Sequence, residues 1–187
     1  MKINDLSLGE LIEETRQIHA RPGGGAISIL TANLAVNLAL MMNKNNWGDL
    51  EDEANKAYKT MLEISDLLTK CADEDIYYAN ILVDQYKKKG PVDQKYLIDA
   101  AKPQVRLNTL ALKAMEVMAF FFEHGKALTL ADGEIANELI YGAIKSSVPT
   151  LEMNLKDTNN KYNIGEALKE AERLYHNNRN IIERRKA

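Results

Sequence analysis

Cysteine and histidine are both scarce in this sequence. Cys71 is the only cysteine among 187 residues, so no disulfide can form within the chain, which indicates a reducing compartment such as the cytoplasm. The three histidines are His19, His124 and His176. None follows a glutamate at the Glu-x-x-His spacing of di-iron helical bundles, and none pairs with another at metal-ligand spacing. We therefore expect no metal site.

An excess of positive charge is also lacking. The formal net charge is −3 and the calculated pI is near 5.7, whereas nucleic-acid and membrane-surface binders carry a basic patch. The first ten residues, MKINDLSLGE, lack the apolar stretch of a signal peptide. The most hydrophobic segment, residues 26–42, is interrupted by Ser28, Thr31, Asn33 and Asn37. A membrane span needs roughly 20 clean apolar residues, so we expect a buried helix and a cytoplasmic protein.

The sequence also lacks the alternation of apolar and polar residues that is typical of β-strands. Its apolar residues recur instead at helical spacing. The pattern predicts an all-α helical bundle forming one domain over residues 1–187. Ser7 and Glu10 have the spacing of a capping box. The apolar segment that follows carries small residues, Ser28, Ala32, Ala35 and Ala39, which allow close packing, so we expect it to be the central helix and a possible subunit contact. Further helices are predicted over 93–124 with Pro103 inside, from a Thr129–Asp132 capping box to 148 with Pro149 ending it, and from 164 onward.

A long helix is predicted over residues 49–89, because nothing stops it before Gly90 and Pro91. About 40 residues at 1.5 Å each would extend roughly 60 Å, which is long for one compact chain of this size. We therefore expect either a break near residues 72–75 or a partner subunit that covers the far end.

Three consecutive glycines, Gly23, Gly24 and Gly25, separate Pro22 from the apolar helix. No P-loop lysine follows them, and the strand that a dinucleotide-binding fingerprint requires is missing. Free backbone N–H groups and the positive end of the helix dipole would suit a carboxylate or phosphate. A tight turn packed against a neighbouring helix would also use glycine. The residues alone leave these two interpretations open.

Several motifs in order resemble the cyclodeaminase/cyclohydrolase family, which comprises the C-terminal domain of formiminotransferase-cyclodeaminase and free-standing bacterial relatives. The resemblance begins at PGGG, residues 22–25, and continues through the acidic triplet 73–75 and the alanine–proline element at 101–103. A second signature runs from Gly125 through LADGEIANELIYGAI, and Asn154 resembles the asparagine of the closing element. The resemblance covers most of the chain.

The resemblance implies an all-α homodimer that acts on a tetrahydrofolate carrying a one-carbon unit, with no cofactor beyond that substrate. In the cyclodeaminase reaction, N10 attacks the formimino carbon on N5 and ammonia leaves, giving 5,10-methenyltetrahydrofolate. In the cyclohydrolase reaction, water opens the methenyl bridge to 10-formyltetrahydrofolate. Both reactions need proton transfer. The predicted catalytic residues are Asp132 and His19, and the predicted substrate-binding residues are Gly23, Gly24, Gly25, Asp73, Asp75, Arg106, Lys126 and Asn154.

Three departures from the family pattern bear on activity. Ala131 stands where the family has serine before the aspartate, Lys126 stands where asparagine is usual, and the first asparagine of the closing element is replaced near Thr150. Three hypotheses therefore remain: a cyclodeaminase, which takes the family's name, a methenyltetrahydrofolate cyclohydrolase, or a helical dimer that binds folate or a partner protein without turnover.

Overall fold

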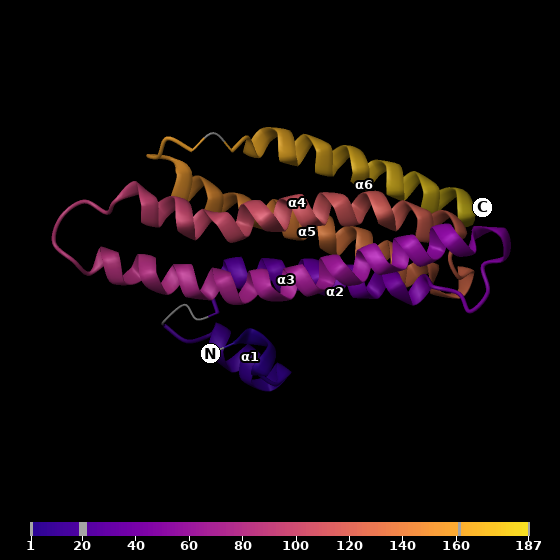
Figure 1. Cartoon of the computed structure of the whole chain (residues 1–187), viewed down its shortest axis with the longest axis horizontal. Coiled ribbons are helices and arrows are strands. Elements are labelled where there is room, and N and C mark those ends of the chain that lie inside the picture. The colour runs from indigo at the N-terminus through magenta and orange to yellow at the C-terminus, as the bar shows by residue number, and fades with distance from the viewer. Residues whose placement is uncertain (1, 19–21, 161, 187) are drawn as a thin grey trace.

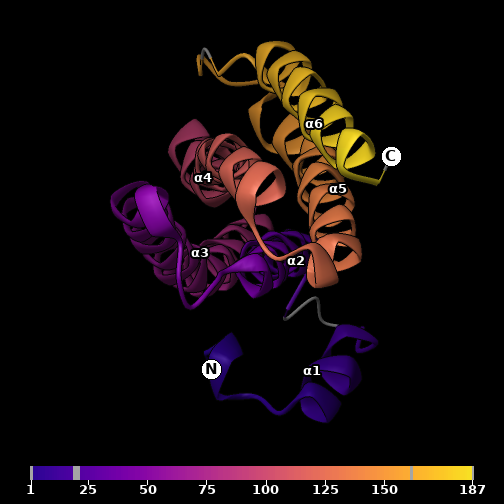
Figure 2. The ribbon, with the colours of Figure 1, turned by 90° about the vertical axis from the view of Figure 1, so that its right-hand side faces the viewer.

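The computed structural model describes residues 2–18, 22–160 and 162–186 and contains only helices and loops over these ranges. Five long helices, α2 to α6, lie side by side along one axis (Figure 1). The short helix α1 lies apart from them, on the side of α2 (Figure 2). The bounds are α1 Leu8–Thr15, α2 Gly24–Ala39, α3 Glu51–Tyr86, α4 Gln94–His124, α5 Leu130–Leu155 and α6 Ile164–Lys186, with short 3-10 turns at Ile3–Asp5, Leu40–Met42, Gly48–Leu50 and Ala127–Thr129. The predicted all-α class is confirmed.

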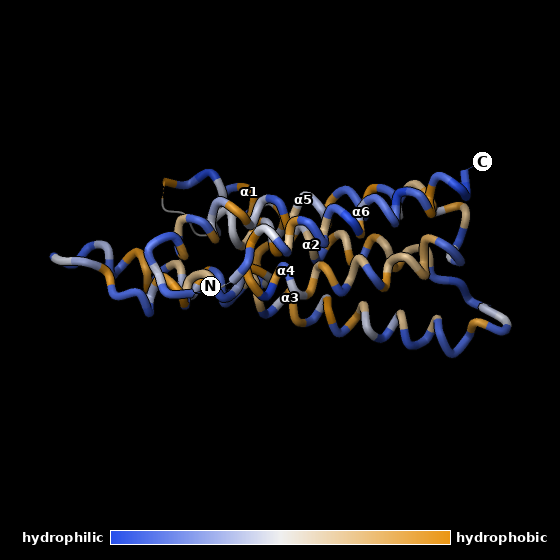
Figure 3. Tube along the Cα trace, turned by 90° about the horizontal axis from the view of Figure 1, so that it is seen from above, coloured by the Kyte–Doolittle hydropathy of each residue, from blue (hydrophilic) through white to orange (hydrophobic). Residues whose placement is uncertain are grey.

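Helices α2, α3, α4 and α5 form an up-and-down bundle, and α6 covers the groove between α4 and α5. Helix α2 contacts α3, α4 and α5, so it holds the central position predicted from its small residues. Ser28, Ala32, Ala35 and Ala39 are all buried, which lets the neighbouring backbones approach closely. Hydrophobic residues line the facing sides of the helices, and the connecting loops at both ends are mostly hydrophilic (Figure 3).

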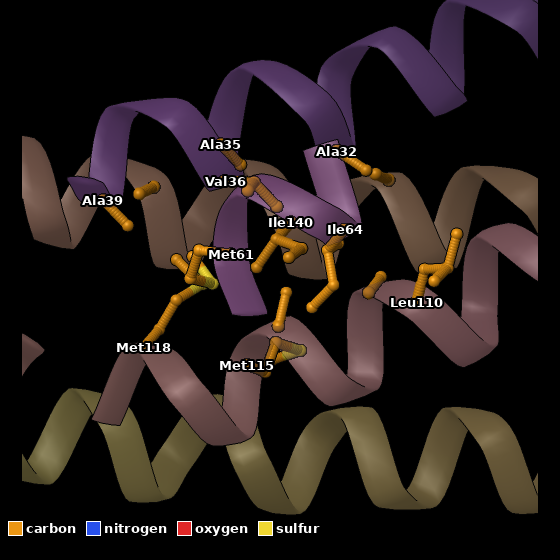
Figure 4. Close-up of a cluster of buried hydrophobic side chains, with 14 of the residues drawn as sticks. Ala32, Ala35, Val36, Ala39, Met61, Ile64, Leu110, Met115, Met118 and Ile140 are labelled. Carbon is orange, nitrogen blue, oxygen red and sulfur yellow. The ribbon is translucent and has the colours of Figure 1, made fainter. Parts of the chain in front are cut away.

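The core is built from small residues on α2 and long flexible ones on its neighbours. Figure 4 shows the alanines of α2 facing methionine and isoleucine side chains of α3, α4 and α5. Small side chains on one helix leave room for long ones opposite, which is how interiors reach crystal-like packing density. The labelled residues are Ala32, Ala35, Val36, Ala39, Met61, Ile64, Leu110, Met115, Met118 and Ile140.

The segment Gly24–Met42 has the length and apolar composition of a membrane span, but half of it is buried inside the bundle. Cys71 is also buried, as its place on an apolar helical stripe predicts. Its thiol donates to the Pro103 carbonyl oxygen at 3.1 Å, and burial raises the pKa of Cys71 to about 12.

Two predicted helix interruptions are wrong. Helix α3 runs unbroken through residues 72–75, because Cys71, Ala72, Asp75 and Ile76 are all buried on its inner face and an elongated bundle supports it along its length. The expected partner at its far end stays a prediction. Helix α5 continues through Pro149 to Leu155. A proline inside a helix destabilises it by about 3 kcal/mol. We attribute the continuation of α5 past Pro149 to the burial of residues in the turns that follow.

The predicted capping box of Ser7 and Glu10 is confirmed. The Ser7 N–H donates to the Glu10 carboxylate at 2.7 Å, and the Glu10 N–H donates to the Ser7 hydroxyl at 3.3 Å. The second predicted box, Thr129 with Asp132, is wrong: the Thr129 side chain makes no capping bond. Its hydroxyl instead donates to the Met41 carbonyl oxygen at 3.3 Å, because the turn before α5 packs against the end of the α2 segment.

Arg185 caps the C-terminal end of α4 from the last turn of α6. Its guanidinium donates to the carbonyl oxygens of Phe122 and Gly125. We expect Arg185→Met to lower the free energy of unfolding by about 1–3 kcal/mol, because two partly buried carbonyl oxygens lose a charged donor. Arg184→Met is the matched control, since Arg184 is exposed and its ion pair is with the exposed Glu123; it should change stability by less than about 0.5 kcal/mol. Equal effects of the two variants in urea unfolding would refute the capping role.

Candidate functional site

The glycine turn places a backbone without side chains against a buried carboxylate. Gly23 precedes α2 and Gly25 is buried in its first turn. A Cβ atom on Gly25 would lie 2.6 Å from both carboxylate oxygens of Asp75 and 2.7 Å from Nε2 of Gln104, closer than real Cβ atoms come. A Cβ on Gly24 would meet no atom within 4 Å. A side chain at position 25 would therefore displace the carboxylate of Asp75, which comes from α3, and the amide of Gln104.

Asp75 is an almost fully buried carboxyl, 7% exposed. It accepts a hydrogen bond from Nε2 of Gln104 at 2.6 Å and another from the backbone N–H of Ala26. Burial raises the pKa of Asp75 to about 6, and the two hydrogen bonds only partly oppose this rise. The ion pairs found among the described residues do not include Asp75. A carboxyl in this state exchanges a proton near neutral pH, which is the property of a general acid or base.

A cavity of about 190 Å³ opens beside Asp75. Four helices contribute to it, namely the start of α2, the second half of α3, the first turns of α4 and the end of α5. It is smaller than the 300–1,000 Å³ of typical ligand sites, so it accommodates a small group or one end of a larger molecule. Its lining residues are Gly23, Gly25, Asp75, Ala79, Leu82, Val83, Tyr86, Ala100, Thr150, Met153 and Asn154.

Two buried amide oxygens at this end of the bundle, Oε1 of Gln104 and Oδ1 of Asn154, have no hydrogen-bond partner among the residues that the structure describes. Gln104 is fully buried and Asn154 is 3% exposed. Buried carbonyl oxygens without a donor are uncommon, and they call for an explanation by a missing ligand or water. Asn154 lines the cavity, although its Oδ1 atom has almost no accessible surface.

The structure brings together four of the predicted residues, Gly23, Gly25, Asp75 and Asn154, around one cavity. Gly24 adjoins them in the chain. Asp73 lies elsewhere: its carboxylate accepts the backbone N–H of Ile3 at 2.8 Å and so holds the N-terminal turn against α3. His19 falls outside the described residues.

Arg106 does not join the cluster around Asp75. Its guanidinium pairs with Glu74 at 2.7 Å, and it lines a different groove of about 650 Å³ on the outer side of α4. The other polar groups of that groove are engaged as well, since Lys102 pairs with Asp99 and Tyr162 accepts from Asn108. This larger groove therefore presents few free polar groups to a ligand.

Asp132 and Lys126 lie at the opposite end of the bundle from Asp75. Asp132 is in the first turn of α5, and the helical rise puts it roughly 33 Å along the axis from Asn154. Lys126 contacts the end of the α2 segment, where its backbone N–H donates to the Met42 carbonyl oxygen at 2.8 Å. Within one chain, Asp132 and Asp75 cannot act on the same reacting carbon. The catalytic role of Asp132 stays a prediction that requires a second subunit.

Packing explains the glycine that opens the second motif. A Cβ on Gly125 would lie 2.7 Å from the Met42 carbonyl oxygen and 2.4 Å from that of Phe121. Both are backbone atoms, which cannot move aside as a flexible side chain can. Gly125 is therefore required by the contact between the end of α4 and the α2 segment, whatever else the motif does.

Gln104 is the site residue that the sequence prediction missed. It is a polar residue one turn beyond Ala100 on the buried face of α4, which also carries Leu107 and Ala111. A polar residue on an otherwise apolar helical face indicates either a buried hydrogen-bond partner or a site. That signal was present in the sequence, but its partner on α3 was not.

The model of the formiminotransferase-cyclodeaminase family matches residues 7–173 of this chain. The chain belongs to this family. Among solved structures, formiminotetrahydrofolate cyclodeaminase from Thermotoga maritima superposes with a TM-score of 0.87 at 22% sequence identity, covering 97% of this chain and 98% of that one. At this identity the likeness establishes a shared fold, and it confirms the fold that the motifs imply. No curated protein matches the chain by sequence.

The raised pKa of Asp75 predicts how the stability of this family member varies with pH. The folded chain holds the Asp75 proton more tightly than the unfolded chain, in which the pKa is the ordinary 3.8. The contribution of this carboxyl to stability therefore falls as pH rises from about 4 to about 6 and stays low above that. At 1.36 kcal/mol per pKa unit, Asp75→Asn should be more stable than the wild type by up to about 3 kcal/mol at pH 8.

Urea unfolding of both proteins at pH 4 and pH 8 measures this difference. The gain in the variant should be much smaller at pH 4, where the wild-type carboxyl is protonated in the folded chain and only about half ionised in the unfolded chain. The same gain at both pH values would show that the buried charge is not its cause.

Proposed function

We propose that this protein is a cytoplasmic formiminotetrahydrofolate cyclodeaminase that acts as a homodimer. Membership of the formiminotransferase-cyclodeaminase family supports the substrate class. The observation that carries the proposal is the buried carboxyl of Asp75, which faces a cavity formed with the glycine turn and Asn154. Asp75 is a proton-transfer group with a near-neutral pKa. It lies where the glycine motif, residues 22–25, meets the acidic triplet, residues 73–75.

The cyclodeaminase reaction requires one proton to move between two nitrogens of the same substrate. When N10 attacks the formimino carbon, a C–N10 bond forms and the N10 proton must leave. The formimino group enters protonated, so after the attack its nitrogen is an amine, and this amine needs one more proton before its bond to carbon breaks and ammonia departs. In this proposal the ionised Asp75 accepts the proton from N10 and returns it to the departing nitrogen. The 5,10-methenyl bridge remains on the folate.

Gln104 and the glycine turn position Asp75 for this transfer. The Gln104 amide and the Ala26 N–H each donate to the carboxylate, which limits its rotation. Apolar walls from Ala79, Leu82 and Ala100 surround the cavity; such walls exclude water, which would otherwise hydrolyse the methenyl product. No cofactor other than the tetrahydrofolate substrate enters this scheme.

The homodimer in this proposal forms through the outward face of α2. The segment Gly24–Met42 contains no charged residue, yet Leu34 is 66% exposed and Met41 is 50% exposed on it. An uncharged helix face with exposed large apolar residues is typical of a protein contact. A second subunit on this face is also the way in which Asp132 could reach a folate site.

The methenyl chromophore tests the enzyme hypothesis with one absorbance assay. With 5-formiminotetrahydrofolate, a cyclodeaminase produces the chromophore and releases one ammonia per bridge formed. With 5,10-methenyltetrahydrofolate, a cyclohydrolase removes the chromophore faster than buffer does. Binding of either folate without turnover would establish the non-catalytic alternative, and neither binding nor turnover would refute the proposal.

A further inference from the structure

Helix α1 has an apolar side, yet none of its eight residues is buried. Leu8 and Ile12 lie one turn apart on that side and are 72% and 55% exposed. Leu11 is partly buried where it packs against the core of the bundle. An isolated helix of this length is marginal in water. The apolar side of α1 therefore needs a packing surface beyond the contact that Leu11 makes.

The segment that carries α1 is fixed at both ends near the start of α2. At its first end, the Ile3 N–H donates to the Asp73 carboxylate of α3 at 2.8 Å. Asp73 comes two residues before Asp75, which lies against Gly25. At its second end, Pro22 is buried directly before the glycine turn. Helix α1 is therefore held beside the start of α2 and apart from the bundle (Figure 2).

An exposed apolar patch lies at the other end of the α2 segment. Leu128 is 96% exposed in the turn before α5, and Met41 is half exposed. The two are neighbours, because the Thr129 hydroxyl donates to the Met41 carbonyl oxygen. Lys126 is exposed in the same turn. We call Met41, Lys126 and Leu128 the end patch. The helical rise puts it roughly 25 Å along the axis from Gly24.

We propose that the apolar side of α1 docks on the end patch of a second copy of this chain. The end patch of the same chain is out of reach, because both attachments of α1 lie at the start of α2. Charge supports this occupant: residues 2–18 carry four carboxylates and two cationic side chains, whereas Lys44 and Lys126 border the end patch. Apolar surface on both sides and opposite charge are the complementarity of a specific protein contact.

The docking sets the orientation of the two chains, and it rests on the homodimer of the proposed function. In a two-fold dimer, each α1 docks on the end patch of the other chain. The start of one α2 then lies beside the end of the other, so the two helices run antiparallel. Asp132 follows the end patch in the first turn of α5. This arrangement brings Asp132 of one chain toward the glycine turn of the other.

Sedimentation velocity of the full-length protein tests the docking. Ile12→Glu should raise the dimer dissociation constant about ten- to a hundredfold, because a carboxylate replaces an apolar contact. Leu128→Glu, on the opposite side of the contact, should raise it by a similar factor. Leu67→Glu is the matched control and should leave it unaltered. Leu67 is 42% exposed on the side of α3 that faces away from Ser65 and Thr69, which bond to α2.

Photo-crosslinking identifies what α1 contacts. Benzoylphenylalanine in place of Ile12 should cross-link to the peptide that contains Leu128. In a mixture of isotope-labelled and unlabelled chains, these products should include pairs that join one chain of each kind. The same probe in place of Leu67 should give no such product. Cross-links confined to single chains would refute the proposal, because α1 would then dock on its own bundle.

The docking and the proposed function can fail separately. A wild type that stays monomeric would overturn the docking and the homodimer together. A dimer that forms with wild-type affinity in both Ile12→Glu and Leu128→Glu would overturn the docking and leave the homodimer standing. Folate turnover is an independent readout. Its absence from a protein that gives the expected cross-links would remove the cyclodeaminase and leave the docking in place.

Discussion

Asp75→Asn is expected to lower the kcat for formiminotetrahydrofolate cyclisation by about 10²–10⁴, the usual contribution of a positioned proton-transfer group. The amide has nearly the same shape, and its one oxygen can still accept from Gln104 Nε2. It cannot accept a proton from N10. The same variant should be more stable than the wild type at pH 8, so lost activity cannot be attributed to unfolding.

Stopped-flow absorbance at the methenyl chromophore measures this rate, and the pH profile adds a second readout. In the wild type, kcat should rise with pH through the Asp75 titration near 6 as the carboxylate forms, because the ionised group is the base. The neighbouring control Asp66→Asn should retain full activity. Activity of Asp75→Asn within threefold of the wild type would refute the assignment of Asp75 as the proton-transfer group.

Asp132→Asn tests the sequence-derived catalytic prediction in the same assay. We expect a loss of about 100-fold if the residue transfers protons, and only a second subunit can bring it to Asp75. Mixing the inactive Asp75→Asn and Asp132→Asn chains would then restore part of the activity, because each mixed dimer regains one intact pair. Full activity of Asp132→Asn would show that Asp132 has only a structural role in the first turn of α5.

Gly25→Ala is expected to abolish most of the activity, while Gly24→Ala next to it leaves activity intact. The new methyl group at position 25 would sit 2.6 Å from the Asp75 oxygens, so Asp75 and Gln104 must move. A displacement on the order of 1 Å at a reacting group costs about 100-fold in rate, and overpacking costs about 1–3 kcal/mol of stability. At position 24 no atom lies within 4 Å, and the loss of glycine flexibility should stabilise the fold by at most ~1 kcal/mol.

The pair is a matched comparison, because the two glycines adjoin each other and undergo the same change. Circular dichroism and urea unfolding report the stability of each variant, and the chromophore assay reports its rate. Equal activity of the two variants would contradict the close approach between α2 and Asp75. A loss of activity in both would indicate instead that the whole turn needs glycine flexibility.

The helices could be predicted from the sequence because their signals are local. Apolar periodicity and the Ser7–Glu10 box depend on residues within a few turns, and the predicted helices recur in the structure. The errors at residues 72–75 and at Pro149 arose where packing overrides local preference. A proline or a long span is tolerated when neighbouring helices bury the residues on either side of it, and the sequence does not show those neighbours.

The candidate site could be predicted only where a motif indicated it. Gly23, Gly25, Asp75 and Asn154 came from the family-like motifs, and they line one cavity. Gln104 lies outside those motifs, and its importance depends on a contact with a residue on another helix. The sequence also did not show that the Asp75 carboxylate lies at the start of α2, because this contact depends on how α3 packs against α2.

The state of Cys71 makes this chain suited to thiol labelling. Its side chain is buried, and its thiol remains protonated at ordinary pH, so maleimide reagents should leave it unmodified in the folded protein. A cysteine introduced at an exposed position such as Leu34 would therefore carry a spin label or a fluorophore alone, without removing the native cysteine. Distances between such labels would report directly whether two copies meet across α2.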